Sequence, residues 1–397
     1  MTRSDHPSSG VWRRPDVCSF AAHAPGEHGG EQHGADLQGA GQHSADLRKE
    51  LDAHWRAMPA QRLLDGGMVH GDVLRLQAAT DSGQRWDEAA ERLGDAQMHR
   101  AEAAAGKGRS RTAIDAYRAA VADFLFAQMP LPDGDRKSAL YSRARAALTA
   151  ITEIPASGLR RIEVPFASGS LVGWLRVPAE ARASVIVFGG QSGWGATYYR
   201  LSYALADRGI ATLMAEGPGQ GESRLVSGIH LDVDVPAAFS RFVDALEAVP
   251  ELTGRPVGIW GNSLGGTFAA ITAAADQRIT ATVVNGGFAA PTLLPFQTFR
   301  EQAAAMLGSD DEAAIEANFA RLAFDPSTDR VNGGILVVHG GADPLVDRED
   351  QTPFLEASED STLLEWPDGD HTIYNDSEAR TAAVADWLAD RLGSPTV

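Results

Sequence analysis

The sequence predicts an α/β protein in which a mostly parallel sheet is flanked by helices and preceded by an all-helical domain. After Pro155, short apolar runs alternate with helical segments, as expected for parallel strands joined by crossover helices. Residues 46–155 instead carry apolar side chains at spacings of three and four, without a strand pattern. The 397 residues leave room for two domains of ordinary size.

The composition argues against several classes of partner. The chain carries 53 acidic and 35 basic residues, a formal net charge of -18, whereas nucleic acid and anionic membranes attract basic surfaces. Cys18 is the only cysteine, which excludes a disulfide framework and a cysteine-based metal site. There is no apolar run of about 18 residues and no apolar core of a secretory signal near Met1. We therefore expect a cytoplasmic protein that binds a small molecule, with no cofactor or metal.

Residues 1–45 are predicted to be a disordered, low-complexity tail. They are rich in Gly, Ser, His and Gln and poor in aliphatic residues, so they offer nothing that could form a core. A histidine-rich tract can also bind metal, which is the alternative for this segment. Its five histidines are His6, His23, His28, His33 and His43.

Residues 46–155 are predicted to be a helical cap domain. Four helical segments are expected, around 47–58, 86–105, 109–129 and 137–154. The third ends before the breaker Pro130-Leu131-Pro132-Asp133-Gly134.

Residues 156–397 are predicted to form the catalytic domain. An antiparallel hairpin over 161–177 opens it, and buried strands alternating with helices follow. The segment between the strands ending near Asn285 and beginning near Ile335 is longer than a simple crossover needs. We expect residues 288–328 to form a small helical insertion over the carboxyl edge of the sheet.

The stretch Gly261-Asn262-Ser263-Leu264-Gly265 follows a predicted buried strand and opens a helix. Its Gly-x-Ser-x-Gly spacing predicts a nucleophile elbow, a sharp turn that holds a serine hydroxyl clear of the sheet. Gly261 and Gly265 lack the Cβ atoms that would collide where strand and helix cross. The Leu264 amide, near the helix N-terminus, is then a donor for a developing oxyanion.

A serine nucleophile needs a base, and that base needs an orienting acid. Asp343 follows the predicted strand 335–338, and His371 follows the predicted strand 362–366, in the order expected for this architecture. The sequence thus predicts Ser263, Asp343 and His371 as a catalytic triad. Competing acids are Asp347, Asp368 and Asp370, and competing bases are His339, a structural residue by its place at a strand end, and His230.

The loop after the first parallel strand, Phe188-Gly189-Gly190-Gln191, is predicted to supply the second oxyanion donor. Its glycines let the backbone approach the substrate, and the Gln191 amide is the candidate; a plain glycine turn is the alternative. The loop 216–223 lacks Gly-Lys-Ser/Thr, so it does not indicate nucleotide binding. The residues expected to line the substrate pocket are Gly190, Trp194, Tyr198, Tyr199, Glu216 and His230.

Residues 158–397 resemble the α/β-hydrolase superfamily. The run 113–129, Gly-Gly at 189–190 and Gly217-Pro218-Gly219-Gln220-Gly221-Glu222 narrow the resemblance to the 2,6-dihydroxypseudooxynicotine hydrolase group, which is similar to fungal enzymes that shorten polyketide chains. The resemblance implies the same triad below a helical cap, cleavage of a carbon–carbon bond beside a ketone, and a dimer. The nicotine-degrading members carry a further glutamate about 30 residues after the nucleophile, whereas this chain has no acid there before Glu301.

These observations together favour a serine-triad hydrolase acting on a hydrophobic, aromatic or polyketide-like ketone or ester. Carbon–carbon cleavage needs a leaving carbanion stabilised by a neighbouring carbonyl or phenol, whereas ester cleavage does not. An ordinary carboxylesterase or thioesterase is therefore one alternative, and a natural-product cyclase or rearrangement enzyme with the same triad is another. A non-catalytic binding protein on this scaffold is the alternative from a different class.

Overall fold

The computed structural model describes residues 33–191 and 193–393, with side chains from residue 44 onward. The chain divides into two units, one that ends at Asp46 and one that begins at Leu47. Helix α1, His33–Ala57, begins inside the segment that the sequence predicts to be a disordered tail. The rest of that predicted tail, residues 1–32, lies outside the described residues, and the metal-binding alternative falls largely there.

The first part of the second unit is helical throughout. The predicted segments near 86, 109 and 137 are present, and two short helices, α2 and α3, lie between α1 and α4 where none was predicted. Helix α5 packs between α4 and α6, and Gly94 on α4 makes room for the Phe124 ring. The elements are α2 Ala60–Asp65, α3 His70–Asp81, α4 Trp86–Ala105, α5 Ser110–Gln128, α6 Asp135–Thr152 and η1 Pro155–Ser157.

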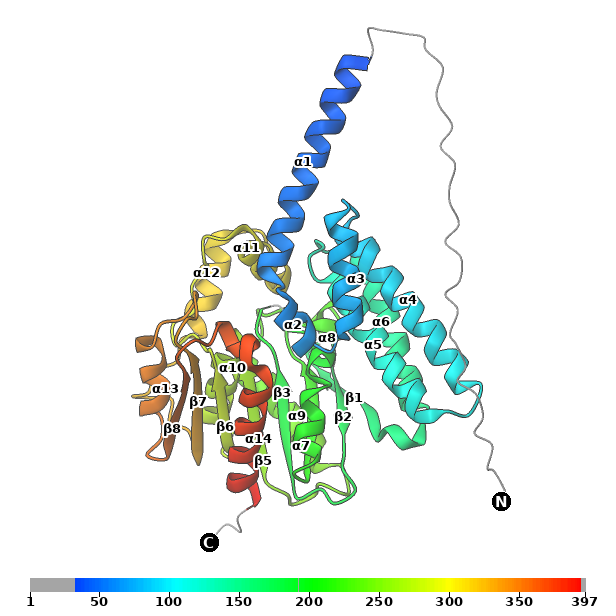
Figure 1. The fold of residues 1–397 in the computed structure, drawn as a ribbon. Coiled ribbons are helices and arrows are strands. Elements are labelled where there is room, and N and C mark those ends of the chain that lie inside the picture. Colours follow the sequence, from blue (N-terminus) through cyan, green and yellow to red (C-terminus); the bar gives the residue numbers. More distant parts are fainter. Residues whose placement is uncertain (1–32, 192, 394–397) are drawn as a thin grey trace, which may run out of the picture. The chain divides into compact units, whose positions relative to one another are not determined.

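An eight-stranded sheet in the order β1-β2-β4-β3-β5-β6-β7-β8 follows in the described chain (Figure 1). The pairs β1–β2 and β2–β4 are antiparallel, and every later pair is parallel, so the carboxyl ends of β3 to β8 lie along one edge. The strands are β1 Leu159–Phe166, β2 Gly169–Arg176, β3 Ala183–Phe188, β4 Ile210–Glu216, β5 Val257–Asn262, β6 Ile279–Asn285, β7 Gly334–Gly340 and β8 Ser361–Trp366.

Helices cover both faces of the sheet, which explains why β3, β5 and β7 are buried along their whole length. Helices α7 and α14 pack on one face through Leu205 and Leu388, while α9 and α10 pack on the other through Phe239 and Phe268. The bounds of these helices are α7 Leu201–Ala206, α9 Val235–Glu247, α10 Leu264–Ala275 and α14 Ser377–Gly393. This is the three-layer arrangement that the alternating sequence pattern predicts.

Shorter helices lie in the connections at the carboxyl edge. Between β6 and β7, in the segment predicted as an insertion, the chain forms α11 and α12. The elements of these connections are η2 Gly195–Tyr198, α8 Gly221–Leu225, α11 Gln297–Leu307, α12 Glu312–Arg321, η3 Glu349–Gln351, α13 Thr352–Glu356 and η4 His371–Asp376. None of the described helices is both long and apolar enough to cross a membrane.

Candidate active site

Ser263 stands in the sharp turn between β5 and α10. Its φ of 60° and ψ of -136° lie outside the regions that residues with side chains prefer. Glycine is required on both sides of Ser263, since a Cβ on Gly261 would overlap the carbonyl of Gly265, and a Cβ on Gly265 would lie 2.5 Å from the Gly189 carbonyl oxygen. Two backbone hydrogen bonds hold the strained residue, from Ser263 N to Asn285 O at 2.8 Å and from Gly266 N to Ser263 O at 2.7 Å.

The structure brings Ser263, His371 and Asp343 together in one hydrogen-bonded row. His371 Nε2 lies 2.8 Å from Ser263 Oγ, and His371 Nδ1 lies 2.8 Å from Asp343 Oδ2. Because an ionised carboxylate only accepts hydrogen bonds, Nδ1 carries the ring proton and Nε2 accepts from the serine hydroxyl. This geometry suits proton transfer from the serine to the imidazole.

Asp343 is held in place by the loop that carries it. Its side chain is fully buried, and Oδ1 accepts hydrogen bonds from the amides of Leu345, at 2.8 Å, and Val346, at 3.3 Å. His339, the competing base at the end of β7, contacts the Val346 carbonyl through Nε2 at 3.2 Å. His339 therefore braces the loop of Asp343, in keeping with the structural role that its position suggests.

The competing acids make other contacts. Asp370 caps η4, where its Oδ1 accepts a hydrogen bond from the Asn375 amide. The backbone amide of Asp347 bonds to Asp350, and the Asp368 carbonyl accepts from the Asn375 side chain. Asp343 is the acid that bonds to the His371 ring.

The loop after β3 passes directly over the start of α10. A Cβ on Gly190 would lie 2.5 Å from Leu264 N and 2.9 Å from Gly265 N, so only glycine allows this approach. Leu264 is the first residue of α10, and an amide at that position has no acceptor within its own helix. Leu264 and the loop carrying Gln191 are therefore neighbours at the place where an oxyanion hole would form.

Two glutamines brace this loop. Gln191 donates through its side chain to the Phe299 carbonyl of α11 at 2.5 Å, which bonds the insertion to the loop. Gln220, which sequence reasoning did not single out, is buried and donates to the carbonyls of Gly189, at 2.6 Å, and Gly190, at 2.9 Å. The sequence signal that could have identified Gln220 is its position just after β4, at the carboxyl edge of the sheet.

Of the predicted pocket residues, Gly190 lies in the loop after β3, and Tyr198 lies beside that loop. A Cβ added to Gly189 would lie 2.6 Å from the Tyr198 hydroxyl. Burial raises the pKa of Tyr198 above its ordinary value. His230 lies against the end of α11, where a Cβ on Gly308 would be 2.8 Å from its ring.

Trp194 and Glu216, in contrast, both contact Tyr141 on α6, in the helical segment formed by α2 to α6. The Trp194 ring packs against Tyr141 with ring centroids 5.2 Å apart. Glu216 accepts hydrogen bonds from the Tyr141 hydroxyl, the Gly195 amide and the Glu222 amide, and burial raises the pKa of Glu216. We expected both residues in the pocket wall, but Trp194 packs the loop before η2 against α6, and Glu216 joins α6 to the end of β4.

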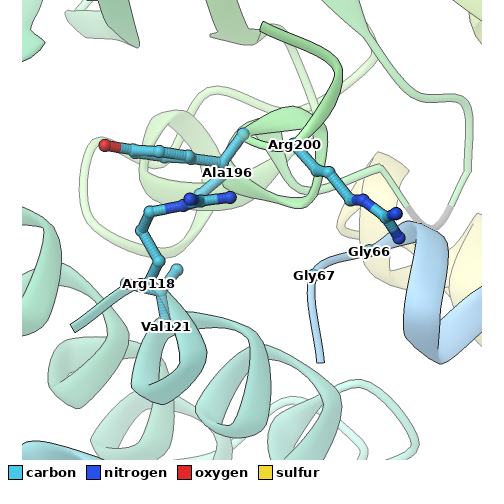
Figure 2. Close-up of a pocket in the computed structure, with 7 residues that line it drawn as sticks. Gly66, Gly67, Arg118, Val121, Ala196 and Arg200 are labelled. Carbon is cyan, nitrogen blue, oxygen red and sulfur yellow. The ribbon is translucent and has the colours of Figure 1, made fainter. Parts of the chain in front are cut away.

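Tyr199 is one of the residues that line a small pocket, which Figure 2 shows with Arg118 and Arg200 labelled. Its ring is stacked by the guanidinium groups of Arg118 and Arg176, each 4.8 Å from the ring centroid. The pocket is lined by Gly66, Gly67, Arg118, Val121, Ala196, Tyr199 and Arg200, none of them in the triad. Tyr199 therefore packs against α5 through Arg118. In the part of the chain with described side chains, no three His, Cys, Asp or Glu residues gather to hold a metal ion.

The comparisons with known proteins agree with this architecture. A family model described as serine aminopeptidase, S33, matches residues 179–309. The 2,6-dihydropseudooxynicotine hydrolase of Paenarthrobacter nicotinovorans is 26% identical over 263 residues, covering 65% of this chain and 69% of that relative. The alpha/beta hydrolase ucsC of Acremonium sp is 28% identical over 268 residues, covering 59% of this chain and 54% of the relative.

Solved structures show the same fold. The crystal structure of 2,6-dihydroxy-pseudo-oxynicotine hydrolase aligns with a TM-score of 0.74 at 23% identity, covering 84% of this chain and 95% of that one. The structure of wild-type AbyA5 aligns with a TM-score of 0.59 at 18% identity, covering 87% and 98%. The chain thus has the α/β-hydrolase fold, with a helical N-terminal region. Its similarity to the 2,6-dihydroxypseudooxynicotine hydrolase group, expected from the sequence, is confirmed.

Proposed function

We propose that this chain is a serine hydrolase that uses Ser263, His371 and Asp343 as its catalytic triad. The observation that carries the proposal is the row of two 2.8 Å contacts from Asp343 through His371 to the hydroxyl of Ser263. The strained backbone of Ser263 supports it, since such strain persists only where the surrounding structure holds it and is frequent at active sites.

In the proposed reaction, Ser263 Oγ attacks a carbonyl carbon while its proton passes to His371 Nε2. The oxyanion that forms accepts hydrogen bonds from the backbone amides of Leu264 and Gln191. Collapse of this intermediate breaks the bond to the leaving group, which takes the proton from His371. A water molecule then gives a proton to His371 and attacks the acyl-serine, which releases a carboxylic acid and restores Ser263.

We propose as substrate a hydrophobic, aromatic or polyketide-like ketone or ester. The support is the similarity to relatives named as a pseudooxynicotine hydrolase and as fungal hydrolases. Cleavage of a carbon–carbon bond produces a carbanion, so the substrate must place a carbonyl or phenol where it can delocalise that charge. The nicotine-degrading group's further glutamate has no counterpart before Glu301, which bonds to Gln297 on α11 and is exposed. The proposal therefore does not extend to the substrate of that group.

Turnover of a small panel tests the proposal. The panel contains para-nitrophenyl esters, an acyl thioester and an aryl 1,3-diketone, each assayed with the wild type and Ser263→Ala. We expect turnover and fluorophosphonate labelling in the wild type, and a loss of both in the variant by a factor of about 10⁴ or more. Diketone cleavage with poor ester turnover would support carbon–carbon hydrolysis, whereas fast ester turnover alone would favour an esterase. A cyclised product would favour the rearrangement chemistry, and full activity of Ser263→Ala would refute the proposed nucleophile.

A further inference from the structure

The carbonyl of Thr372, the residue directly after His371, accepts two side-chain hydrogen bonds. Arg380 Nη1 on α14 donates to it at 2.9 Å, and Asn285 Nδ2 at the end of β6 donates to it at 3.2 Å. Thr372 and Arg380 are each only 2% exposed, so water does not compete for these contacts. The backbone beside the proposed base is therefore fixed from two directions.

This fixation matters because the backbone after His371 is strained. Thr372 has a φ of 60° and Ile373 a φ of 57°, and both are β-branched residues, which rarely adopt left-handed conformations. Such conformations are unfavourable for residues with side chains and persist only where surrounding contacts impose them. Without its two donors, the Thr372 carbonyl would be free to turn, and the His371 ring would move with it.

Arg380 also extends the network to the helical segment. Its Nη2 donates to Asp65 Oδ1 at 2.9 Å, and Asp65 is the last residue of α2, 315 positions earlier in the chain. The Asp65 side chain is 18% exposed and that of Arg380 only 3%, so the pair is largely shielded from solvent. A buried guanidinium needs such a counter-charge, since an unpaired buried charge is strongly destabilising.

On the other side, the network reaches the nucleophile. Asn285 Nδ2 also donates to Asn262 Oδ1 at 2.9 Å, and the Asn285 carbonyl accepts from the amide of Ser263 at 2.8 Å. Asn262 in turn donates to the Phe188 carbonyl at 3.1 Å, just before the proposed oxyanion loop. A continuous chain of hydrogen bonds thus runs from α2 past His371 to both sides of Ser263.

We infer that Arg380, paired with Asp65, is a positioning residue that sets the His371 ring relative to Ser263. Helix α2 then contributes to the reaction by orienting the base, without touching the substrate. The inference rests on the proposed function, because it assigns a role in aligning the triad. This positioning role needs both terminal nitrogens of the guanidinium, because Nη1 bonds to the Thr372 carbonyl and Nη2 bonds to Asp65.

The competing explanation is that Arg380 and Asp65 only stabilise the fold. The double variant Asp65→Asn/Arg380→Met separates the two roles. It removes both charges together, so it leaves no unpaired buried charge and is expected to recover most of the thermal stability that Asp65→Asn loses. The Thr372 carbonyl still lacks its arginine donor in the double variant, so a positioning defect would remain.

The experiment measures kcat, KM, the rate of fluorophosphonate labelling and the melting temperature, using an ester whose turnover depends on Ser263. The variants are Arg380→Lys, Asp65→Asn and the double variant, all assayed where each is fully folded. The matched control is Asp133→Asn, because Asp133 also joins the helical segment to a buried arginine, Arg224, away from the His371 loop. Arg224 otherwise donates to the Ala305 carbonyl.

We expect Arg380→Lys and the double variant to lower kcat and the labelling rate by about tenfold to a hundredfold, with KM within about twofold, since small misplacements of a reacting group are costly. Asp133→Asn should lower the melting temperature while leaving kcat unchanged. If kcat of the double variant recovers along with its melting temperature, the pair is only structural and the inference is overturned. Wild-type kcat in Arg380→Lys would overturn it as well. Turnover that survives Ser263→Ala would instead refute the proposed function itself.

Discussion

The hydroxyl of Tyr141 donates a hydrogen bond of 2.6 Å to Glu216 Oε2, and both residues are buried. Tyr141 lies on α6 of the helical segment, while Glu216 is the last residue of β4. The other Glu216 oxygen accepts from the Gly195 amide at 3.1 Å, and Oε2 also accepts from the Glu222 amide at 2.7 Å. One carboxyl group therefore fixes two loops at the carboxyl edge and joins them to the helical segment.

We predict that Tyr141→Phe lowers the free energy of unfolding by about 1–3 kcal/mol, because it leaves a buried acceptor with one donor fewer. Glu216→Gln should lower the free energy of unfolding at least as much, because the new amide N–H₂ would face a backbone N–H that donates to the carboxyl group in the wild type. Urea unfolding of both single variants and the double variant measures the coupling. Because the two residues share one hydrogen bond, the losses of unfolding free energy in the two single variants should not add up in the double variant. Strictly additive losses would contradict a stabilising bond between Tyr141 and Glu216.

Asp343→Asn should reduce kcat/KM by about 10⁴-fold while preserving the fold. An asparagine side chain can donate to Nδ1, which favours the tautomer with a proton on Nε2, and that tautomer cannot accept the serine proton. The matched control is Asp347→Asn, in the same loop but exposed, which should retain nearly full activity. The ester assay measures the activity of each variant, and unfolding curves check that each is folded. Equal activity losses in the two variants would contradict the assignment of Asp343 as the acid that orients His371.

The hydrogen-bonded row of Ser263, His371 and Asp343 was predictable because each of these residues follows a strand within a short, recognisable stretch. The Gly-x-Ser-x-Gly spacing identifies Ser263, and the order of strands along the chain brings Asp343 and His371 to the same edge. Parallel pairing of β5 to β8 makes this possible, because it places the carboxyl ends of the strands together. The fold class was predictable from the alternation of apolar runs with helical segments after Pro155.

The residues that brace the site were not predictable in this way. Arg380 contacts Asp65 across 315 positions, and the sequence around either residue looks like an ordinary helix surface. Trp194 and Glu216 follow strands as pocket residues do, but contacts with α6 bury them, and those contacts depend on how the helices dock. Helix α3 was missed although Val73, Leu76 and Thr80 form a buried stripe, because only two of these three are apolar.

Gly190→Ala should lower kcat by about 10²–10³-fold without unfolding the protein. The added Cβ would lie 2.5 Å from the Leu264 amide, so the loop carrying Gln191 must move away from the proposed oxyanion site. Loss of one such donor typically costs about 10²–10³-fold in kcat. Gly106→Ala is the control, because its Cβ would meet only the Glu102 carbonyl, at 3.4 Å. Circular dichroism should show both variants folded, and wild-type kcat in Gly190→Ala would contradict the assignment of this loop.

Asp123, on α5, is predicted to make the stability of the protein fall as the pH rises. Its side chain is fully buried, and burial, with the adjacent charge and hydrogen bond of Asp72, raises its pKa well above the ordinary value. Asp72 accepts hydrogen bonds from Gln97 at 2.6 Å and from Arg75 at 2.5 Å, and a protonated Asp123 carboxyl can act as a further donor to Asp72. At a pH below the ordinary pKa of aspartate, near 4, both folded and unfolded chains hold this proton and its stabilising contribution is complete.

As the pH rises from about 4 to the raised pKa of the folded state, the unfolded chain releases this proton first, so folding loses up to about 1.4 kcal/mol per pH unit. Asp123→Asn keeps a donor towards Asp72 but cannot titrate, which removes this slope. Unfolding free energies of the wild type and the variant, measured by urea from pH 4 to pH 8, should therefore diverge in favour of the variant as the pH increases. Parallel curves for the two proteins would show that Asp123 titrates alike in both states, because the remaining carboxylates and histidines contribute equally to each curve and cancel in the difference.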